Sequence, residues 1–498
     1  MLPNRGVHWL FAALAGVAMY FVALPEAHAV PSFSRKYHTS CQTCHTVYPV
    51  LNAFGEAFRR DGYRFPSTDG SVDSDVEKAP SVELGQDQYK KMFPMAVWPD
   101  KIAEAVPLSI WLNGGVAANL PGSAAADGAG NNFAWGGIAA EMHIFGAGSF
   151  SDNVTYMAQL TLETDFGDPP GSFDVETAYL LWNDILGPSH LVNLWVGRLF
   201  APQLTSYGLH SSFLSDTVMP GVSVGGLYNA TAGLTLGQGH TDGVELNGIA
   251  GHRFGYSLGW IGSTTAPGLS MPNSEDVYAH VGFKLGGLSL DGEGGGASTD
   301  TQRPWAETSL TFDVFGYHGL SRLDNGTGAV PNGTATPIQQ DDRISAVGGL
   351  LHGQLGSLVL MAGLNFEHHD RPYPGSAATA GPNGTVFNGV PDLTSANAIV
   401  QYDEVDYIVW PWFVPGVRAE FTQTSVEGAS NAQLMRIIPG IAMLARPNIK
   451  FVLSGDLEWA NNLPVVGSWG PAGGMIAPNP GQSKFEAEQI NATVGLAF

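Results

Sequence analysis

The sequence feature that constrains the fold most is an alternation of apolar and polar residues with a period of two. In residues 277–285, valine, alanine, phenylalanine and leucine occupy the odd positions, and tyrosine, histidine, glycine and lysine occupy the even ones. Residues 154–163, 449–459 and 489–498 follow the same pattern. Successive side chains of a strand point to opposite faces, so each run predicts a strand with one apolar and one polar face.

Composition indicates which surroundings these strands have. Charged residues make up 13% of the chain, against about 25% in ordinary soluble domains, while 64 residues are glycine. After the N-terminus, no stretch reaches the about 20 apolar residues of a transmembrane helix. This combination is typical of a transmembrane β-barrel. We therefore predict a mainly β fold, an antiparallel barrel of roughly 16 strands (about 14 to 18) over residues 108–498, set in a lipid bilayer.

The connections between the predicted strands fall into two classes. Short ones are predicted at residues 252–255, 286–287, 354–356 and 445–448. Long ones, rich in Gly, Pro, Asn and Ser, are predicted at residues 201–242, 264–273, 325–340, 370–395 and 461–482. Barrels of the bacterial outer membrane have short turns at the periplasmic end and long loops outside. The last strand ends on Phe498, which resembles the C-terminal strand of such proteins.

The N-terminus carries a targeting pattern. Arg5 gives a short basic region, the residues from Trp9 to Leu24 are almost wholly apolar, and Ala27 and Ala29 fit a signal-peptidase site. Residues 1–29 are thus predicted to be a signal peptide, with an uncleaved anchor as the alternative. Export of the chain across a bacterial inner membrane agrees with a location in the outer membrane.

The net charge of −23 argues against nucleic acid as a partner.

The only two cysteines stand in a C-x-x-C-H motif, Cys41-Gln42-Thr43-Cys44-His45. This motif attaches a c-type haem: each thiol forms one thioether, and the histidine becomes the proximal iron ligand. The alternatives are a zinc site, which lacks a second cluster of ligands, and a bare C-x-x-C redox pair. We predict one covalent haem c held by Cys41, Cys44 and His45.

The residues around the motif predict a small α-helical haem segment over residues 30–66. Its apolar positions recur every three to four residues and predict one amphipathic helix: Val47, Leu51, Phe54, Ala57 and Phe58. Gly62 is a plausible helix stop. Residues 67–107 are predicted to be a linker and barrel entry, and residues 81–99 form either the first barrel strand or a cover over the haem.

The N-terminal part of the chain resembles the N-terminal block of a known family. The positions that match are residues 30–37, the motif, residues 49–55, Phe58 and residues 62–66. This family is the fused monohaem cytochrome–porin family of the bacterial outer membrane, which includes the outer-membrane iron oxidases. The resemblance implies one haem c joined to a porin-like barrel of about 16 strands.

The resemblance and the motif together predict electron transfer across the outer membrane. The expected donor is extracellular Fe(II), and the expected acceptor is a periplasmic electron-transfer protein, either a cytochrome or a copper protein. Whether the chain is an enzyme, an Fe(II) oxidoreductase, stays open. Two alternatives remain, namely a channel for small solutes with a haem plug or sensor, and outward electron export to an extracellular acceptor.

The ligand on the distal face of the haem is less constrained. Met92 and Met95 are candidates, because methionine opposite histidine raises the reduction potential. His38 or an open sixth position are alternatives. Oxygen and imidazole groups that bind iron transiently are candidates at two strand ends: His368, His369 and Asp370, and Asp403, Glu404 and Asp406.

Overall fold

A computed structural model describes the chain in residues 32–37, 39–48, 50–64, 81–83, 87–92, 94–95, 101–103, 108–120, 133–150, 153–163, 172–187, 190–200, 212–214, 240–262, 276–294, 296, 303, 305–324, 339–370, 395–426, 431–461 and 484–497. The predicted signal peptide, His38 and Phe498 lie outside the described residues.

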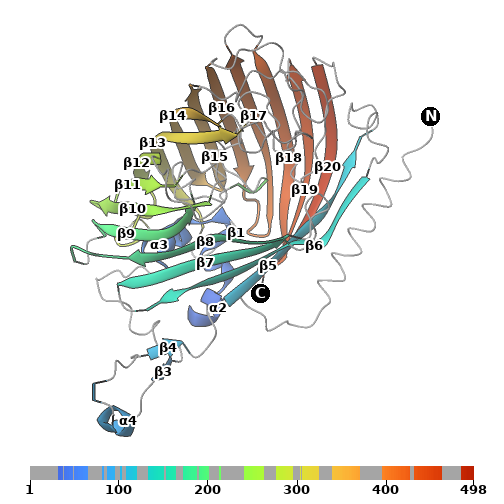
Figure 1. The fold of residues 1–498 in the computed structure, drawn as a ribbon. Helices are drawn as coiled ribbons and strands as arrows, with labels where there is room; N and C mark the ends of the chain where they lie inside the picture. Colours follow the sequence, from blue (N-terminus) through green and yellow to red (C-terminus); the bar gives the residue numbers. More distant parts are fainter. Residues whose placement is uncertain are drawn as a thin grey trace, which may run out of the picture.

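Sixteen antiparallel strands close into a barrel (Figure 1). In chain order they are β5 (Leu108–Asn119), β6 (Phe133–Ser149), β7 (Val154–Glu163), β8 (Ser172–Trp182), β9 (Asn193–Phe200), β10 (His240–Ala250), β11 (Phe254–Ile261), β12 (Asp276–Gly286), β13 (Glu307–Asp324), β14 (Gln339–Gly356), β15 (Leu358–His369), β16 (Ala396–Tyr407), β17 (Phe413–Val426), β18 (Ala432–Arg446), β19 (Ile449–Asn461) and β20 (Lys484–Ala497). β20 pairs with β5, so no edge is left unpaired. The predicted barrel and its strand number are confirmed.

The two faces of each strand differ as the alternation predicts. In β12, Tyr278, His280 and Lys284 are buried, whereas Val277 and Phe283 are exposed. The buried polar side chains point into the lumen, and the exposed apolar side chains form the outer wall. This is the arrangement expected of a barrel that is surrounded by lipid. No described helix is long and apolar enough to cross a membrane.

The connections agree with the prediction at three of the four short turns. β10–β11, β14–β15 and β18–β19 are joined by one to three residues. The expected tight turn at Gly286-Gly287 is wrong, because β13 begins only at Glu307. The described part of this connection folds back onto the β10–β11 turn, where Leu290 N donates to the carbonyl of His252.

The N-terminal segment that is predicted to carry the haem, called the haem segment below, lies inside the barrel. It comprises α2 (Ser32–Tyr37), the short 3-10 helix η1 (Cys41–Thr43), β1 (His45–Val47), β2 (Val50–Leu51) and α3 (Ala53–Arg60). Val47 and Leu51 therefore belong to a small hairpin, not to the predicted helix. The helix starts only at Ala53 because Asn52 caps it.

Residues 81–103 lie apart from the barrel strands. β3 (Ser81–Glu83) pairs with β4 (Lys101–Ala103), and α4 (Asp87–Met92) lies between them in the chain. Figure 1 shows these three elements outside the ring of strands. Both expectations for residues 81–99 are therefore wrong, because the first barrel strand is β5 and α4 is not packed over the haem motif.

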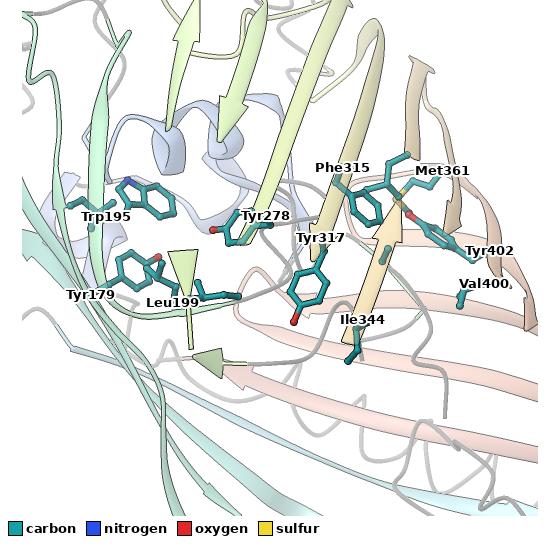
Figure 2. Packing of buried hydrophobic residues seen from close by; sticks show 14 of the residues in the cluster. Tyr179, Trp195, Leu199, Tyr278, Phe315, Tyr317, Ile344, Met361, Val400 and Tyr402 are labelled. Carbon is teal, nitrogen blue, oxygen red and sulfur yellow. The ribbon is translucent and has the colours of Figure 1, made fainter. Parts of the chain in front are cut away.

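Two groups of buried hydrophobic residues join the segment to the wall. The larger one packs Tyr37, Phe58 and Tyr63 against lumen-facing residues of β8 to β16. Figure 2 shows its wall members, from Tyr179 and Trp195 round to Tyr402. The smaller group packs Val47 and Val50 of the hairpin against β15, β17, β18 and residues 213–214. The segment is thus held between two sides of the lumen.

Candidate functional site

The C-x-x-C-H motif adopts a tight turn that leads into a strand. Ser40 caps η1 by accepting a hydrogen bond from the backbone N–H of Gln42 at 3.3 Å. The N–H of Cys44 donates to the carbonyl of Cys41 at 3.2 Å. This turn holds both thiols and His45 on one short, ordered stretch of backbone.

Asn52 ties this turn to α3. Its Oδ1 accepts from the N–H of Gly55 at 2.9 Å, which caps the helix. Its Nδ2 donates to the carbonyls of Gln42 and Thr43, both at 3.1 Å. One side chain therefore fixes the start of the helix against the haem motif, and the cap and the motif turn depend on each other.

Two glycines allow α3 to pack where it does. A Cβ on Gly55 would lie 2.1 Å from the carbonyl oxygen of Cys44, so only glycine lets the helix approach the motif this closely. Gly62 has a φ of +67° and ends the helix, with the N–H of Tyr63 donating to the carbonyl of Phe58. The predicted stop at Gly62 is confirmed.

The thiol of Cys44 packs against an aromatic group. The cluster it packs against includes Tyr37, Phe58 and Tyr63, and Phe33 packs on these rings, with the rings of Phe33 and Phe58 4.9 Å apart. Burial, with a contribution from Cys41, raises the pKa of Cys44 to about 12. Burial also raises the pKa of Cys41. Both thiols are therefore protonated and poorly nucleophilic in the folded chain.

A series of aromatic rings connects His45 to the barrel wall. The ring centroids of His45 and Tyr48 are 5.0 Å apart, and those of Tyr48 and Trp111 5.6 Å. Trp111 on β5 stacks on His143 of β6 at 4.7 Å. The imidazole expected to bind iron is thereby directed toward the wall at β5 and β6.

The donor set fits a c-type haem. Two free thiols with the required spacing, followed at once by an imidazole, are ordered on one turn beside an aromatic group that can cover a porphyrin. The zinc alternative finds no support, because within the described residues the motif does not come together with further ligands into a metal-binding group. The types, spacing and surroundings of these three residues therefore fit the predicted haem.

A cluster of charged residues fastens the end of the segment to the turn between β8 and β9. Arg64 Nη2 lies 2.6 Å from Asp61 Oδ1 and 2.7 Å from Asp184 Oδ2. His190 Nδ1 lies 3.1 Å from Asp61 and 3.4 Å from Asp184, and its Nε2 lies 3.3 Å from Glu293. We call Asp61, Arg64, Asp184, His190 and Glu293 the rim cluster.

Protonation in the rim cluster follows from its burial and its charges. Burial opposes a positive charge on His190, but the contacts with Asp61, Asp184 and Glu293 outweigh it and raise the pKa of His190 to about 9. Burial raises the pKa of Asp61, and its contacts with His190 and Arg64 offset this only in part. At neutral pH the cluster therefore contains a protonated His190 between carboxylates.

The lumen wall opposite the β8–β9 side carries a row of buried ion pairs. Arg418 lies 3.0 Å from Glu404 and 2.6 Å from Glu420, and Arg436 lies 3.0 Å from Glu420 and 2.6 Å from Asp456. Four neighbouring strands, β16 to β19, supply these residues. Buried charges require such partners, so the row is first of all a structural element of the wall.

Residues 212–214, the described part of the connection between β9 and β10, lie in the lumen. Ser212 Oγ donates to Glu404 at 2.8 Å, and the N–H of Phe213 donates to the same carboxylate at 3.2 Å. Phe213 and Leu214 pack with the hairpin of the haem segment. The sequence predicted an external loop here, and the inward course of residues 212–214 was missed because loop composition carries no signal for it.

A cavity open to solvent lies between the haem segment and the wall. Glu56 and Arg60 of α3 line it on one side, and Lys284, His352 and Tyr402 line it on the other. The segment therefore narrows the lumen without filling it on this side.

The methionines predicted as distal ligands lie far from the motif in the fold. Met92, at the end of α4, is 61% exposed and Met95 is 93% exposed. Figure 1 shows α4 outside the barrel, whereas the motif lies within it. The structure thus brings Cys41, Cys44 and His45 together and does not bring either methionine to them.

The candidate iron-binding groups at the two strand ends are divided by strand alternation. His369 is fully buried in the lumen beside Glu367, while His368 and Asp370 are exposed. Asp403 is exposed on the outer wall, whereas Glu404 and Asp406 point inward. Neither group comes together as a site, because neighbours in a strand face opposite ways.

Sequence reasoning did not identify the residues that hold the segment in place. Asp61 and Arg64 lie about 120 positions before Asp184 and His190 in the sequence, and the four residues follow no known motif. The one signal available was a run of charged residues, Arg59 to Asp61 and Arg64, at the end of an otherwise apolar helix.

The chain is a closed antiparallel barrel with an apolar outer wall, and solved structures of outer-membrane proteins and porins are similar to it. OmpT of Vibrio cholerae shares 10% identity with a TM-score of 0.48, over 78% of this chain and 96% of that one. An anion-selective porin from Comamonas acidovorans shares 13% identity with a TM-score of 0.47, over 78% and 98%. OmpF of Salmonella typhi shares 12% with a TM-score of 0.44, over 78% and 97%.

No protein-family description matches the sequence. No curated protein matches it either. The similarity is therefore one of fold.

Proposed function

We propose that this protein transfers electrons across the outer membrane through a single c-type haem held inside a porin-type barrel. The haem is attached to Cys41 and Cys44, with His45 as its proximal ligand. Extracellular Fe(II) is the proposed donor, and a periplasmic cytochrome or copper protein is the acceptor. The protein belongs, on this proposal, to the fused cytochrome–porin type that its N-terminal block resembles.

The position of the haem motif carries this proposal. The bilayer interior is about 30 Å thick, so one redox centre can connect its two sides only from within the barrel. The segment that carries the motif packs against lumen residues of β5 and β8 through Tyr48 and Tyr63, and the rim cluster holds its end. A haem c bound there supplies a one-electron redox couple, and the protein sets its potential by ligation and burial.

The chain's own residues would perform three tasks in this function. Asn52 and Gly55 keep the motif turn rigid. The aromatic group around Cys44 excludes water from one side of the haem site. Carboxylates that face the lumen, such as Glu367, favour the entry of cations over anions from outside.

A channel for small solutes is the second candidate, and the barrel fold alone favours it over electron transfer. The open cavity beside α3 and the charged wall of the lumen are the observations that support it. In that case the haem segment acts as a plug or sensor. Electron export to an extracellular acceptor uses the same site in reverse and differs only in potential.

Purified full-length protein separates these functions. Electron transfer from iron predicts one covalent haem per chain, a positive midpoint potential and reduction by Fe(II). The Cys41→Ala/Cys44→Ala variant is the control and should keep its barrel but lose the haem. Absence of covalent haem, or a strongly negative potential, contradicts iron oxidation, and solute flux that is equal in both proteins favours the channel.

A further inference from the structure

The haem segment has no methionine that could bind the iron opposite His45. Residues 30–66 contain no Met, and the histidine other than His45 is His38, three residues before Cys41. Met92 and Met95 are exposed, and α4, which ends at Met92, lies outside the barrel. The barrel wall surrounds the motif. A protein side chain that binds the opposite face of the iron therefore has to come from this wall.

Two contacts of the segment show which part of the wall lies near the motif. The ring of His45 packs on Tyr48, which packs on Trp111 of β5. Near the end of the segment, the Tyr63 hydroxyl lies 3.0 Å from that of Tyr179 on β8. Strands β6 and β7 lie between β5 and β8 in the barrel order, so their lumen faces lie between these two contacts.

The lumen faces of these two strands offer two strong iron ligands among the described residues, His143 and Met157. His143 is engaged through both ring nitrogens. Its Nδ1 lies 2.8 Å from Thr161 Oγ1, and its Nε2 lies 3.3 Å from Glu141. It also stacks on Trp111 at 4.7 Å. Binding iron would cost His143 these contacts.

Met157 makes no polar contact of this kind among the described residues. It stands on β7 with the parity of the buried Thr155 and Thr161, and its register partner is Tyr179. It packs against the same hydrophobic group as Cys44. Methionine is unbranched and its thioether sulfur adapts to irregular space, so the side chain can reach toward the motif without moving the strand.

Met361, the other lumen methionine that packs in this group, faces elsewhere. It lines the open cavity on the far side of α3. Figure 2 shows it beside Phe315 and Tyr402, away from Tyr179 and Trp195. This wall is not the one that the C-x-x-C-H motif faces.

We propose that Met157, from the barrel wall, is the sixth ligand of the haem iron. This inference rests on the proposed haem. It makes the coordination shared between two parts of the fold, with His45 from the segment and Met157 from β7. The iron is then fully ligated only when the segment is docked, which couples the potential of the haem to its position in the barrel.

The test is Met157→Leu in the full-length, haem-loaded protein, because leucine has a similar volume and no thioether. The ferric spectrum should lose the far-red charge-transfer band of a methionine-ligated haem, and the midpoint potential should fall. Met157→His should restore a low-spin spectrum at a lower potential than the native protein. Met142→Leu, at an outward position of β6, and Met361→Leu should leave spectrum and potential unchanged.

Each outcome decides the matter. Covalent haem with an unchanged spectrum in Met157→Leu overturns the ligand and leaves the haem site intact. A changed spectrum in Met361→Leu instead assigns the ligand to the opposite wall and overturns the inference as well. A native protein without covalent haem overturns the proposed function itself, which mass measurement on the denatured chain reveals independently.

Discussion

Replacing Arg64 by Met should loosen the haem segment from the barrel. Arg64 contacts Asp184 across the boundary at 2.7 Å, and within the segment it contacts the carboxylate of Asp61 at 2.6 Å and its carbonyl at 2.9 Å. Its side chain is 13% exposed and both carboxylates are 6% exposed, so solvent screens these contacts little. Hydrogen bonds to charged groups contribute about 1.5–3 kcal/mol each, and loss of one partner of a buried pair costs about 3–5 kcal/mol.

His190 stays close to both carboxylates and offsets part of this loss. We therefore expect docking of the segment to weaken by about 2–4 kcal/mol, which makes its open state roughly 30 to 1,000 times more populated. Hydrogen exchange of peptides covering residues 50–64, measured by mass spectrometry in detergent, reports this opening. Peptides from β14 and β15 should exchange as in the native protein.

Two comparisons make the experiment decisive. Arg343→Met, at an exposed position of β14, removes the same charge far from the segment and should change nothing. In a double-mutant cycle with Asp184→Asn, the combined effect should be smaller than the sum of the single effects. Unchanged protection of residues 50–64 in Arg64→Met would refute the reasoning, because the segment would then be held by its apolar contacts alone.

Three further predictions concern the same region. Because the pKa of His190 is raised from 6.5 to about 9, its contribution to docking of the segment is complete below pH 6.5 and is lost as the pH rises through 9. Docking measured by hydrogen exchange should therefore weaken over that pH range, and His190→Gln should abolish this pH dependence. Cys41 and Cys44 should react with iodoacetamide many times faster in denaturant than in folded apoprotein at pH 8, and equal rates would contradict their burial. Gly55→Ala should destabilise the segment by about 1–3 kcal/mol in the same exchange assay, since its Cβ meets the Cys44 carbonyl, whereas Gly356→Ala, with open space around it, should leave the segment unaffected.

The barrel could be predicted from the sequence because its rule is local. Alternation along a single strand, as in residues 277–285, shows both the strand and its two faces. The haem motif is likewise a contiguous pattern of five residues. Each of these signals is complete within a short stretch of chain, so no knowledge of the fold is needed to recognise it.

What could not be predicted depends on contacts between distant residues. The hairpin at Val47 and Leu51 imitates helical spacing, and only the cap formed by Asn52 shows where the helix begins. The contact between Arg64 and Asp184 joins residues 120 positions apart. Met157 looks like any residue of a strand until the barrel closes and packs it against the same hydrophobic group as Cys44.

Electron transfer through a sealed membrane tests the central claim most directly. Full-length protein is placed in liposomes that contain a reducible cytochrome, and Fe(II) is added outside. The account predicts that the internal cytochrome becomes reduced while a membrane-impermeant solute stays inside, and that the Cys41→Ala/Cys44→Ala variant shows no reduction. Haem that is present and reduced by Fe(II) while the internal cytochrome stays oxidised would contradict it.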